Sequence, residues 1–265
     1  MMPRHLIVLR HGQSQGNVME KNPAIQELLK DVPNHQFRLT EKGVEQAKIA
    51  GEWLQNYLQG PFIGGTEIAG YVSTFVRAKE TAGNLRLGLK WRRSPFIVER
   101  DWGNFNSLAA EDQARVKAAM KKDPIHLRKP NGESLSHLLV TNYLFFGKLH
   151  REHPDDAVIA VCHGERFLTI RYQLENFTDR QMVKLLSSSR ISDRVKNCQL
   201  LEYSRVNPET NEEIEHYGWM RSFCPWELRD KDLHWKKIVR AKMTDDDLLA
   251  YAEQFPRFSL EGLDS

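Results

Sequence analysis

Short apolar segments alternate with longer segments of helical periodicity along most of this chain. The clearest apolar segments are HLIVL at residues 5–9 and AVIAVC at residues 157–162, and further short strands are expected at IAGYVST, FIVE and NCQLLEY. Strands that are apolar throughout are typical of a parallel sheet with helices on both faces. The alternation therefore predicts an α/β fold, a three-layer sandwich around a mainly parallel central sheet.

The segments between these strands show the spacing of helices. From Val44 to Leu58, apolar or small residues recur at intervals of three and four positions, and Thr40 precedes them as an N-cap. Helices are also expected at residues 77–87 and 134–153, and TDDDLLAYAEQF near the end of the chain reads as a capped helix.

Size and composition exclude several classes of protein. The 265 residues, 40% of them hydrophobic, suit one sizeable domain or one domain with an appendage. No apolar run approaches the roughly 18 to 20 residues of a membrane span, and the apolar core of MMPRHLIVLRHG is too short for the secretory signal that would be expected of an exported protein. The three cysteines form no C-x-x-C pair and the net charge is only +3, so we expect a cytoplasmic protein that binds neither membranes nor nucleic acid.

Polar residues suited to anions follow three of the expected strands. Arg10 and His11 come after the first strand, Arg77 lies just beyond IAGYVST, and His163 and Gly164 follow AVIAVC. Ligands of open α/β sheets bind at the carboxyl ends of the strands. Guanidinium groups match phosphate oxygens, and the first backbone N–H groups of a helix hold anions. The sequence therefore predicts a phosphate pocket at the carboxyl ends of the strands.

Several motifs occur together in one order: RHGQSQGN from Arg10, RAKETA from Arg77, ERDWG from Glu99, GES at 132–134, and HG at 163–164. This ordered set resembles the histidine phosphatase superfamily, the clan that includes phosphoglycerate mutase. The resemblance covers roughly the first 200 residues. It implies a histidine phosphatase-like α/β domain over residues 1–204, with a cap over the pocket at about 104–134.

The resemblance also implies roles for individual residues. His11 would accept the phosphoryl group, and Arg10, Arg77 and His163 would bind the phosphoryl oxygens. Glu99 would be the proton donor. Asn17, Gln13, Gly164 and Arg100 would contribute to substrate binding, without a metal ion or another cofactor.

Chemistry sets requirements for these roles. His11 can attack phosphorus only through an unprotonated nitrogen, so its other ring nitrogen should bond a backbone carbonyl. His163 is expected to be protonated beside the phosphate. Glu99 must carry a proton to donate it to the leaving group, so we expect burial or nearby anionic phosphate to raise its pKa.

Other interpretations of the same residues remain open. Arg77 could pair with Glu80, His163 could be a core histidine, and Glu99 could belong to a solvated charge cluster. A noncatalytic or metal-dependent protein that uses the same pocket is another possible function. His11, His163 and Glu99 could be the ligands of a metal ion, but the adjacent arginines would repel a divalent cation. A phosphomonoesterase acting on a small phosphorylated metabolite is the main hypothesis.

The mutase alternative depends on residue 16. Mutases of this superfamily have a tryptophan where this chain has Gly16, which favours hydrolysis over mutase activity.

Two further segments have weaker signals. The cap contains six basic residues, most of them expected on a solvated face: Arg115, Lys117, Lys121, Lys122, Arg128 and Lys129. Residues 205–265 contain three tryptophans and are expected to pack on the main domain as a lid or a subunit contact, which would allow a homo-oligomer.

Overall fold

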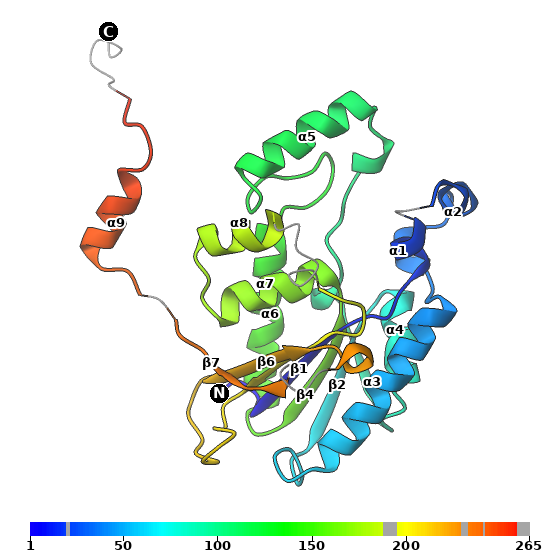
Figure 1. Cartoon of the computed structure of the whole chain (residues 1–265), viewed down its shortest axis with the longest axis vertical. Helices are drawn as coiled ribbons and strands as arrows, with labels where there is room; N and C mark the ends of the chain where they lie inside the picture. The colour runs from blue at the N-terminus through cyan, green and yellow to red at the C-terminus, as the bar shows by residue number, and fades with distance from the viewer. Residues whose placement is uncertain (20–21, 188–194, 229–232, 241, 259–265) are drawn as a thin grey trace.

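A central sheet organises the chain in the computed structural model, which describes residues 1–19, 22–187, 195–228, 233–240 and 242–258 (Figure 1). The described residues form one sheet in the order β3-β2-β4-β1-β5-β6-β7. Its parallel part consists of β1 (His5–Arg10), β2 (Ile68–Ser73), β3 (Trp91–Ser94) and β4 (Ala157–Cys162). The antiparallel strands are β5 (Leu200–Ser204), β6 (Trp219–Phe223) and β7 (Lys236–Lys237).

Helices cover both faces of this sheet, as β1 shows most clearly. Its Leu6 and Val8 join a core cluster with residues of α6 (Leu135–Glu152) and α7 (Gly164–Leu174). Its Ile7 and Leu9 join a second cluster with α3 (Glu41–Gln59) and α4 (Val76–Asn84). Successive side chains of a strand point to opposite faces, so an unbroken apolar strand supplies both cores. The predicted three-layer α/β architecture is confirmed.

Further helices and 3-10 turns are present in the described residues. They are α1 (Gln15–Met19), α2 (Pro23–Leu29), α5 (Ala110–Lys122), α8 (Asp179–Ser187) and α9 (Asp245–Ala252), with 3-10 turns at Asn34–Gln36, Pro95–Ile97, Phe105–Ser107 and Pro225–Glu227. The expected N-cap of α3 is confirmed, since the Thr40 side chain accepts from Gly43 N. The helix at TDDDLLAYAEQF is confirmed as α9, which begins in a capping box at Thr244.

The strand expected at FIVE is wrong. Residues 91–94 form β3 instead, paired with β2 from Gly70 to Ser73. Pro95 then begins a 3-10 turn, and the Ser94 side chain accepts from Phe96 N. Proline has no N–H to donate to a strand ladder, so the sheet pairing ends before it.

The sheet continues past residue 204, where the sequence suggested a domain boundary. β6 pairs along its whole length with β5, and Arg221 of β6 donates to the buried Glu202 of β5 at 2.7 Å. Figure 1 shows α9 standing away from the sheet, and all its residues are exposed. Thus β6 and β7 belong to the sheet, whereas α9 lies away from it. None of the helices in the described ranges is both long and apolar enough to cross a bilayer.

Candidate active site

The two predicted site histidines lie together at the carboxyl ends of β1 and β4. Arg10 and Cys162 are paired at the ends of these neighbouring parallel strands, so the residues that follow them emerge side by side. The rings of His11 and His163 have centroids 5.2 Å apart, and both side chains are buried. The sheet register thus brings together two residues separated by about 150 positions in the sequence.

Hydrogen bonds fix the tautomer of His11. Its Nδ1 lies 2.7 Å from the carbonyl oxygen of Gly12, so Nδ1 carries the proton and donates it. Arg77 Nε donates to Nε2 of the same ring at 3.2 Å, which makes Nε2 an acceptor. Burial, then the charges of Arg77 and Arg10, lower the pKa of His11 well below its usual value. The ring is therefore neutral, with a lone pair on Nε2, as expected for a nucleophile.

Arg77 projects from the first turn of α4 into the same space. Its Nη1 donates to Asn34 O at 2.7 Å and to Asn34 Oδ1 at 3.1 Å, and its guanidinium lies 4.8 Å from the Phe75 ring centroid. Glu80, the alternative partner suggested by the sequence, accepts instead from Arg38 Nη2 at 2.6 Å and from Leu39 N at 2.8 Å. Arg77 is thus oriented toward His11.

His163 lies beside His11 with its pKa shifted by burial and by neighbouring groups. Burial, followed by His11 and Arg77, lowers its pKa well below the usual value, so the ring is neutral in the protein without a bound anion. Its Nε2 lies 2.7 Å from Ser73 Oγ at the end of β2. An anion beside this ring would favour protonation, since an opposite charge stabilises the charged form.

Contacts with α3 and α4 hold residues 10–17, which we call the nucleophile loop. Gly12 N donates to Thr81 Oγ1 at 3.0 Å, and a Cβ at Gly12 would lie 2.4 Å from Gly43 O. Gln13 N donates to Gln46 Oε1 at 2.9 Å. The Gln13 side chain, predicted to bind substrate, accepts from Thr40 Oγ1 at 2.9 Å and so joins the N-cap of α3.

Asn197 also holds the nucleophile loop, although no sequence motif points to it. Its Nδ2 donates to His11 O and to Asn17 Oδ1, both at 3.1 Å. Its carbonyl oxygen accepts from Trp226 Nε1 at 2.7 Å. Asn197 therefore joins the nucleophile loop to the segment that follows β6. A signal for it could come only from tertiary contacts, because it stands in an ordinary NCQ sequence before β5.

The other residues predicted near the phosphate lie around this loop. Arg10 Nη1 donates to Val195 O. Gly164 is the first residue of α7, and a Cβ there would lie 3.3 Å from Arg10 Nε. Asn17 Oδ1 also accepts from Ser14 N at 3.2 Å, closing the loop on itself. The structure thus brings Arg10, Asn17 and Gly164 to the end of the sheet where His11 lies.

Glu99 and Arg100 lie in the segment that leads from β3 into the cap. Burial, then the negative charge of Glu165, raises the pKa of Glu99, while Arg100 N, Arg77 and Arg10 oppose this shift. The direction is the one expected for a proton donor. Arg100 is buried, and its Nε donates to Glu165 Oε2 at 2.8 Å. Arg100 thus holds the first turn of α7, where Glu165 lies.

A family model described as the histidine phosphatase superfamily (branch 1) matches residues 6–200. The chain belongs to this superfamily. The matched range runs from β1 to β5 and contains the predicted site residues.

Known relatives of this superfamily member include both mutases and phosphatases. A 2,3-bisphosphoglycerate-dependent phosphoglycerate mutase from Brucella ovis is 26% identical over 205 residues, which cover 69% of this chain and 87% of the relative. A mycobacterial glucosyl-3-phosphoglycerate phosphatase complexed with VO3 has a TM-score of 0.57 at 21% identity, covering 76% of this chain and 91% of that chain. An alpha-ribazole phosphatase from Shigella flexneri has a TM-score of 0.56 at 19% identity, covering 80% and 96%. At these identities the structural likeness establishes the fold.

Residue 16 of this superfamily member has a neighbour that the sequence did not suggest. A Cβ at Gly16 would lie 2.9 Å from Cδ2 of Phe37, whose ring is buried. Phe37 therefore fills the space beside the nucleophile loop that a larger residue 16 would occupy. The absence of a tryptophan at residue 16 does not leave that space empty.

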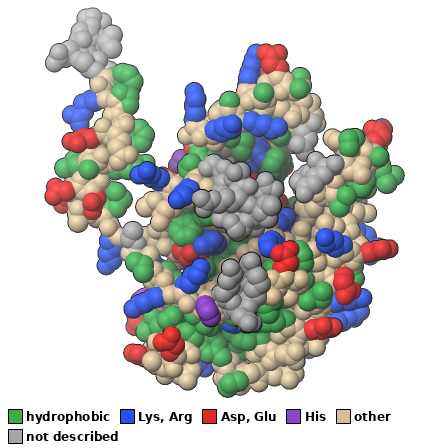
Figure 2. Space-filling model, viewed as in Figure 1, with side chains coloured by type: hydrophobic (Ala, Val, Ile, Leu, Met, Phe, Trp, Pro, Cys, Tyr) green, Lys and Arg blue, Asp and Glu red, His purple; other side chains and the backbone are tan. Residues whose placement is uncertain are grey.

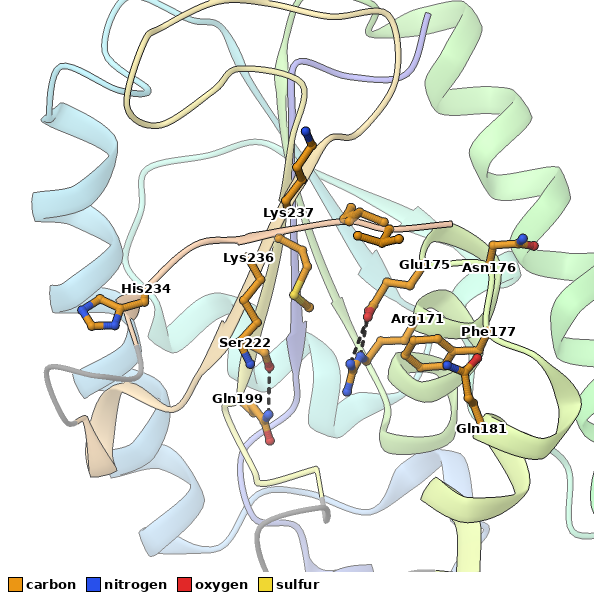
Figure 3. Close-up of a pocket in the computed structure, with 13 residues that line it drawn as sticks. Arg171, Glu175, Asn176, Phe177, Gln181, Gln199, Ser222, His234, Lys236 and Lys237 are labelled. Atoms are coloured by element: carbon orange, nitrogen blue, oxygen red, sulfur yellow. Dashed lines mark hydrogen bonds and ion pairs between the residues drawn. The ribbon is translucent and has the colours of Figure 1, made fainter. Parts of the chain in front are cut away.

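A separate cavity of about 370 Å³ lies between α7 and the antiparallel end of the sheet. Figure 3 shows Arg171 of α7, its C-cap residue Glu175, Ser222 of β6 and Lys236 of β7 around it, with Arg171 paired to Glu175. None of the site residues predicted from the sequence lines this cavity. The superfamily residues thus gather at another place, around His11.

Proposed function

We propose that the protein is a phosphomonoesterase that forms a phosphohistidine at His11, without a metal ion, on a small phosphorylated metabolite. The observation that carries the proposal is the state of the His11 ring: Nδ1 bonds Gly12 O, and the unprotonated Nε2 faces Arg77 Nε at 3.2 Å. A neutral histidine beside a guanidinium suits attack on a phosphate held by that guanidinium.

The first half-reaction transfers the phosphoryl group to the protein. Nε2 of His11 forms a bond to phosphorus as the bond to the leaving oxygen breaks. Arg10 and Arg77 stabilise the charge on the equatorial oxygens, and His163 becomes protonated as that charge approaches. Glu99 gives its proton to the leaving alkoxide, which departs as an alcohol.

The second half-reaction restores the enzyme. Glu99, now a carboxylate, takes a proton from a water molecule, and the water oxygen bonds to phosphorus. The bond from phosphorus to His11 Nε2 breaks, and inorganic phosphate leaves. The raised pKa of Glu99 suits both roles, because a carboxyl with a pKa nearer neutrality can give and take the same proton.

Trapping of the intermediate tests this mechanism. Brief exposure to a ³²P-labelled phosphomonoester followed by denaturation should leave acid-labile, base-stable label on the protein. His11→Ala should carry no label, whereas His126→Ala, at an exposed histidine of the cap, should be labelled like the parent. Label on His11→Ala at the parent level would refute His11 as the acceptor.

A phosphoglycerate mutase-type transferase is the second candidate function. Phe37 beside Gly16 favours it, because bulk next to the nucleophile loop protects a phosphohistidine from water. The comparison uses 3-phosphoglycerate with a trace of the bisphosphate. A phosphatase releases phosphate, and a mutase yields 2-phosphoglycerate without phosphate release.

A metal-dependent or purely phosphate-binding protein is less well supported. Within the described ranges, no three His, Cys, Asp or Glu side chains gather closely enough to hold a metal ion. The test is exhaustive chelation, which should leave phosphatase activity unchanged.

We also propose a cytoplasmic location, which suits three cysteines that are all free.

A further inference from the structure

One basic side chain of the cap turns inward. Most of the cap cations named above are exposed, as the solvated-face interpretation expected: Arg115, Lys117, Lys121, Lys122 and Arg128. Lys129 is only 1% exposed. Lysine is among the residues least often buried without a partner. Lys129 therefore requires an explanation that its exposed neighbours do not.

Backbone contacts fix Lys129 next to the segment that carries Glu99 and Arg100. Gly132 N donates to Lys129 O at 2.9 Å, and Asn104 N donates to Pro130 O at 3.0 Å. Gly103 has a φ of +54°, and a Cβ there would lie 2.2 Å from Pro130 O. We call residues 99–104 and 129–133 together the cap junction. Its tight backbone packing leaves the Lys129 side chain little freedom to turn toward solvent.

Two cationic donors in the cap junction lack acceptors. Neither Lys129 Nζ nor Arg100 Nη1 has a hydrogen-bond partner among the described residues, and both are buried. Trp102 lies against both groups, with Lys129 Nζ over its ring and the Arg100 guanidinium carbon 5.5 Å from its centroid. An aromatic face offsets part of the cost of burying a cation, but it accepts no conventional hydrogen bond.

The nearby carboxyl groups do not supply the missing acceptor. Glu165 is engaged by Nε and Nη2 of Arg100. Glu99 Oε1 accepts from Arg100 N at 3.1 Å, and no hydrogen bond joins Glu99 to Lys129 Nζ or Arg100 Nη1. Burial, followed by the charge of Arg100, lowers the pKa of Lys129 to about 7. Burial of a positive charge and burial of an N–H group without an acceptor each cost free energy. A bound anion would remove both costs, since it would neutralise the charge and accept hydrogen bonds from these N–H groups.

We propose that Arg100 Nη1 and Lys129 Nζ form a subsite for a second anionic group of the substrate, a carboxylate or a second phosphate. This inference rests on the proposed phosphatase function, because Glu99 protonates the leaving group from the same side. The substrate class is then a phosphomonoester whose leaving alcohol bears an anion.

Nonhydrolysable phosphonates test the subsite by equilibrium binding. Three matched ligands are titrated calorimetrically: propylphosphonate, with no second anion; carboxyethylphosphonate; and propylene diphosphonate. The parent protein should bind at least one of the two ligands with a second anionic group about tenfold more tightly than propylphosphonate. This gain is typical of one charge-assisted hydrogen bond. The tighter of the two identifies the second anion as carboxylate or phosphate.

Variants assign that preference to Lys129. Lys129→Met should reduce it to less than about twofold while propylphosphonate binds as before. Lys122→Met, at an exposed cap lysine, should keep the parent preference. Lys129→Gln is the second variant and should also lose the preference.

Several results would overturn the subsite. They are equal affinity of the parent for all three phosphonates, a full preference in Lys129→Met, and a uniform loss of all affinities in both Lys129 variants, which would make Lys129 a residue of the fold. Hydrolysis of p-nitrophenyl phosphate is measured in parallel. Hydrolysis without a preference for the ligands with a second anionic group refutes the subsite alone. That preference without hydrolysis refutes the phosphatase function alone.

Discussion

The nucleophile loop and the cap junction meet at the same site, yet their polar atoms are satisfied differently. In the nucleophile loop, ring and backbone groups of His11, Gly12 and Gln13 have protein partners supplied by α3, α4 and Asn197. In the cap junction, Arg100 Nη1 and Lys129 Nζ are buried without an acceptor in the described chain.

This difference separates two demands on one site. A nucleophile must be held in one geometry before substrate arrives, so its hydrogen bonds are made within the protein. A group that selects substrates gains affinity by leaving a donor for the ligand to satisfy. Between these two regions, the satisfied atoms hold His11 in place, whereas Arg100 Nη1 and Lys129 Nζ belong to the proposed anion subsite. Figure 2 shows basic side chains of the cap on the surface, and these take no part in this contrast.

The largest expected effect is the loss of the nucleophile itself. His11→Ala should lower kcat for any phosphomonoester by roughly three orders of magnitude or more, because no other group can take the phosphoryl from the substrate. Steady-state phosphate release measures this effect, and the exposed His126→Ala is the matched control. Turnover within tenfold of the parent would place the nucleophile elsewhere.

Replacement of Glu99 should come next and should depend on the leaving group. Glu99→Gln should slow alkyl phosphates about 10²-fold or more, and p-nitrophenyl phosphate far less, since nitrophenolate leaves without a proton. Equal slowing of both substrates would contradict the acid role. Glu111→Gln, at an exposed residue of α5, controls for the loss of a cap carboxylate.

The pH dependence of kcat should reflect the protonation states of Glu99 and His11. The acid form of Glu99 must be present, so kcat for alkyl phosphates should fall as pH rises through its raised pKa. His11 must be neutral, and because its pKa is lowered, its protonation should reduce the rate only well below pH 6.5. A pH–rate profile of Glu99→Gln should lack the alkaline decline. Retention of that decline would assign it to another group.

Loss of the support behind the nucleophile should have a smaller effect. Asn197→Ala removes the donor to His11 O and Asn17 Oδ1, and we expect kcat to fall roughly ten- to hundredfold through misplacement of His11. The exposed Asn56→Ala is the control. Unchanged kcat in a folded Asn197→Ala protein would show that α3 and α4 hold the loop without it.

The smallest expected effect concerns water beside the phosphohistidine. Phe37→Ala should shorten the lifetime of the trapped phosphoenzyme about two- to fivefold, because water gains access next to Gly16. Rapid-quench decay of the label measures it, with thermal unfolding to follow the stability loss of about 3 kcal/mol expected for a buried phenylalanine. The double variant Phe37→Ala with Gly16→Trp should restore the longer lifetime, and the exposed Phe258→Ala should decay like the parent.

The sequence was sufficient to predict those strands and helices whose residues follow a regular local pattern. β1 has an apolar run at residues 6–9, β4 is apolar throughout, and α3 has a clear period and an N-cap at Thr40, so each could be located in advance. The apolar run FIVE forms no strand, because Pro95 before it begins a 3-10 turn and ends the sheet pairing. Strands β6 and β7 were missed because polar residues and tryptophans follow no simple alternation there.

The site was predictable to the extent that it lies in motifs. His11, Arg77 and His163 follow strands and could be expected to converge. Asn197 and Phe37 could not be found, because their importance comes from contacts across the fold. The cap cations look alike in sequence, and only the backbone packing of Gly103 against Pro130 separates the buried Lys129 from the exposed ones.

The central position of β1 has a consequence for the order in which the protein is made. β1 is synthesised first, but its sheet neighbours β4 and β5 begin at Ala157 and Leu200, and the partner of the Asn197 carbonyl is Trp226. Pairings between such distant segments form slowly, and their edges are exposed until they form. A nascent chain therefore carries His11 without its neighbours from β4, β5 and Asn197 until those segments have also been synthesised.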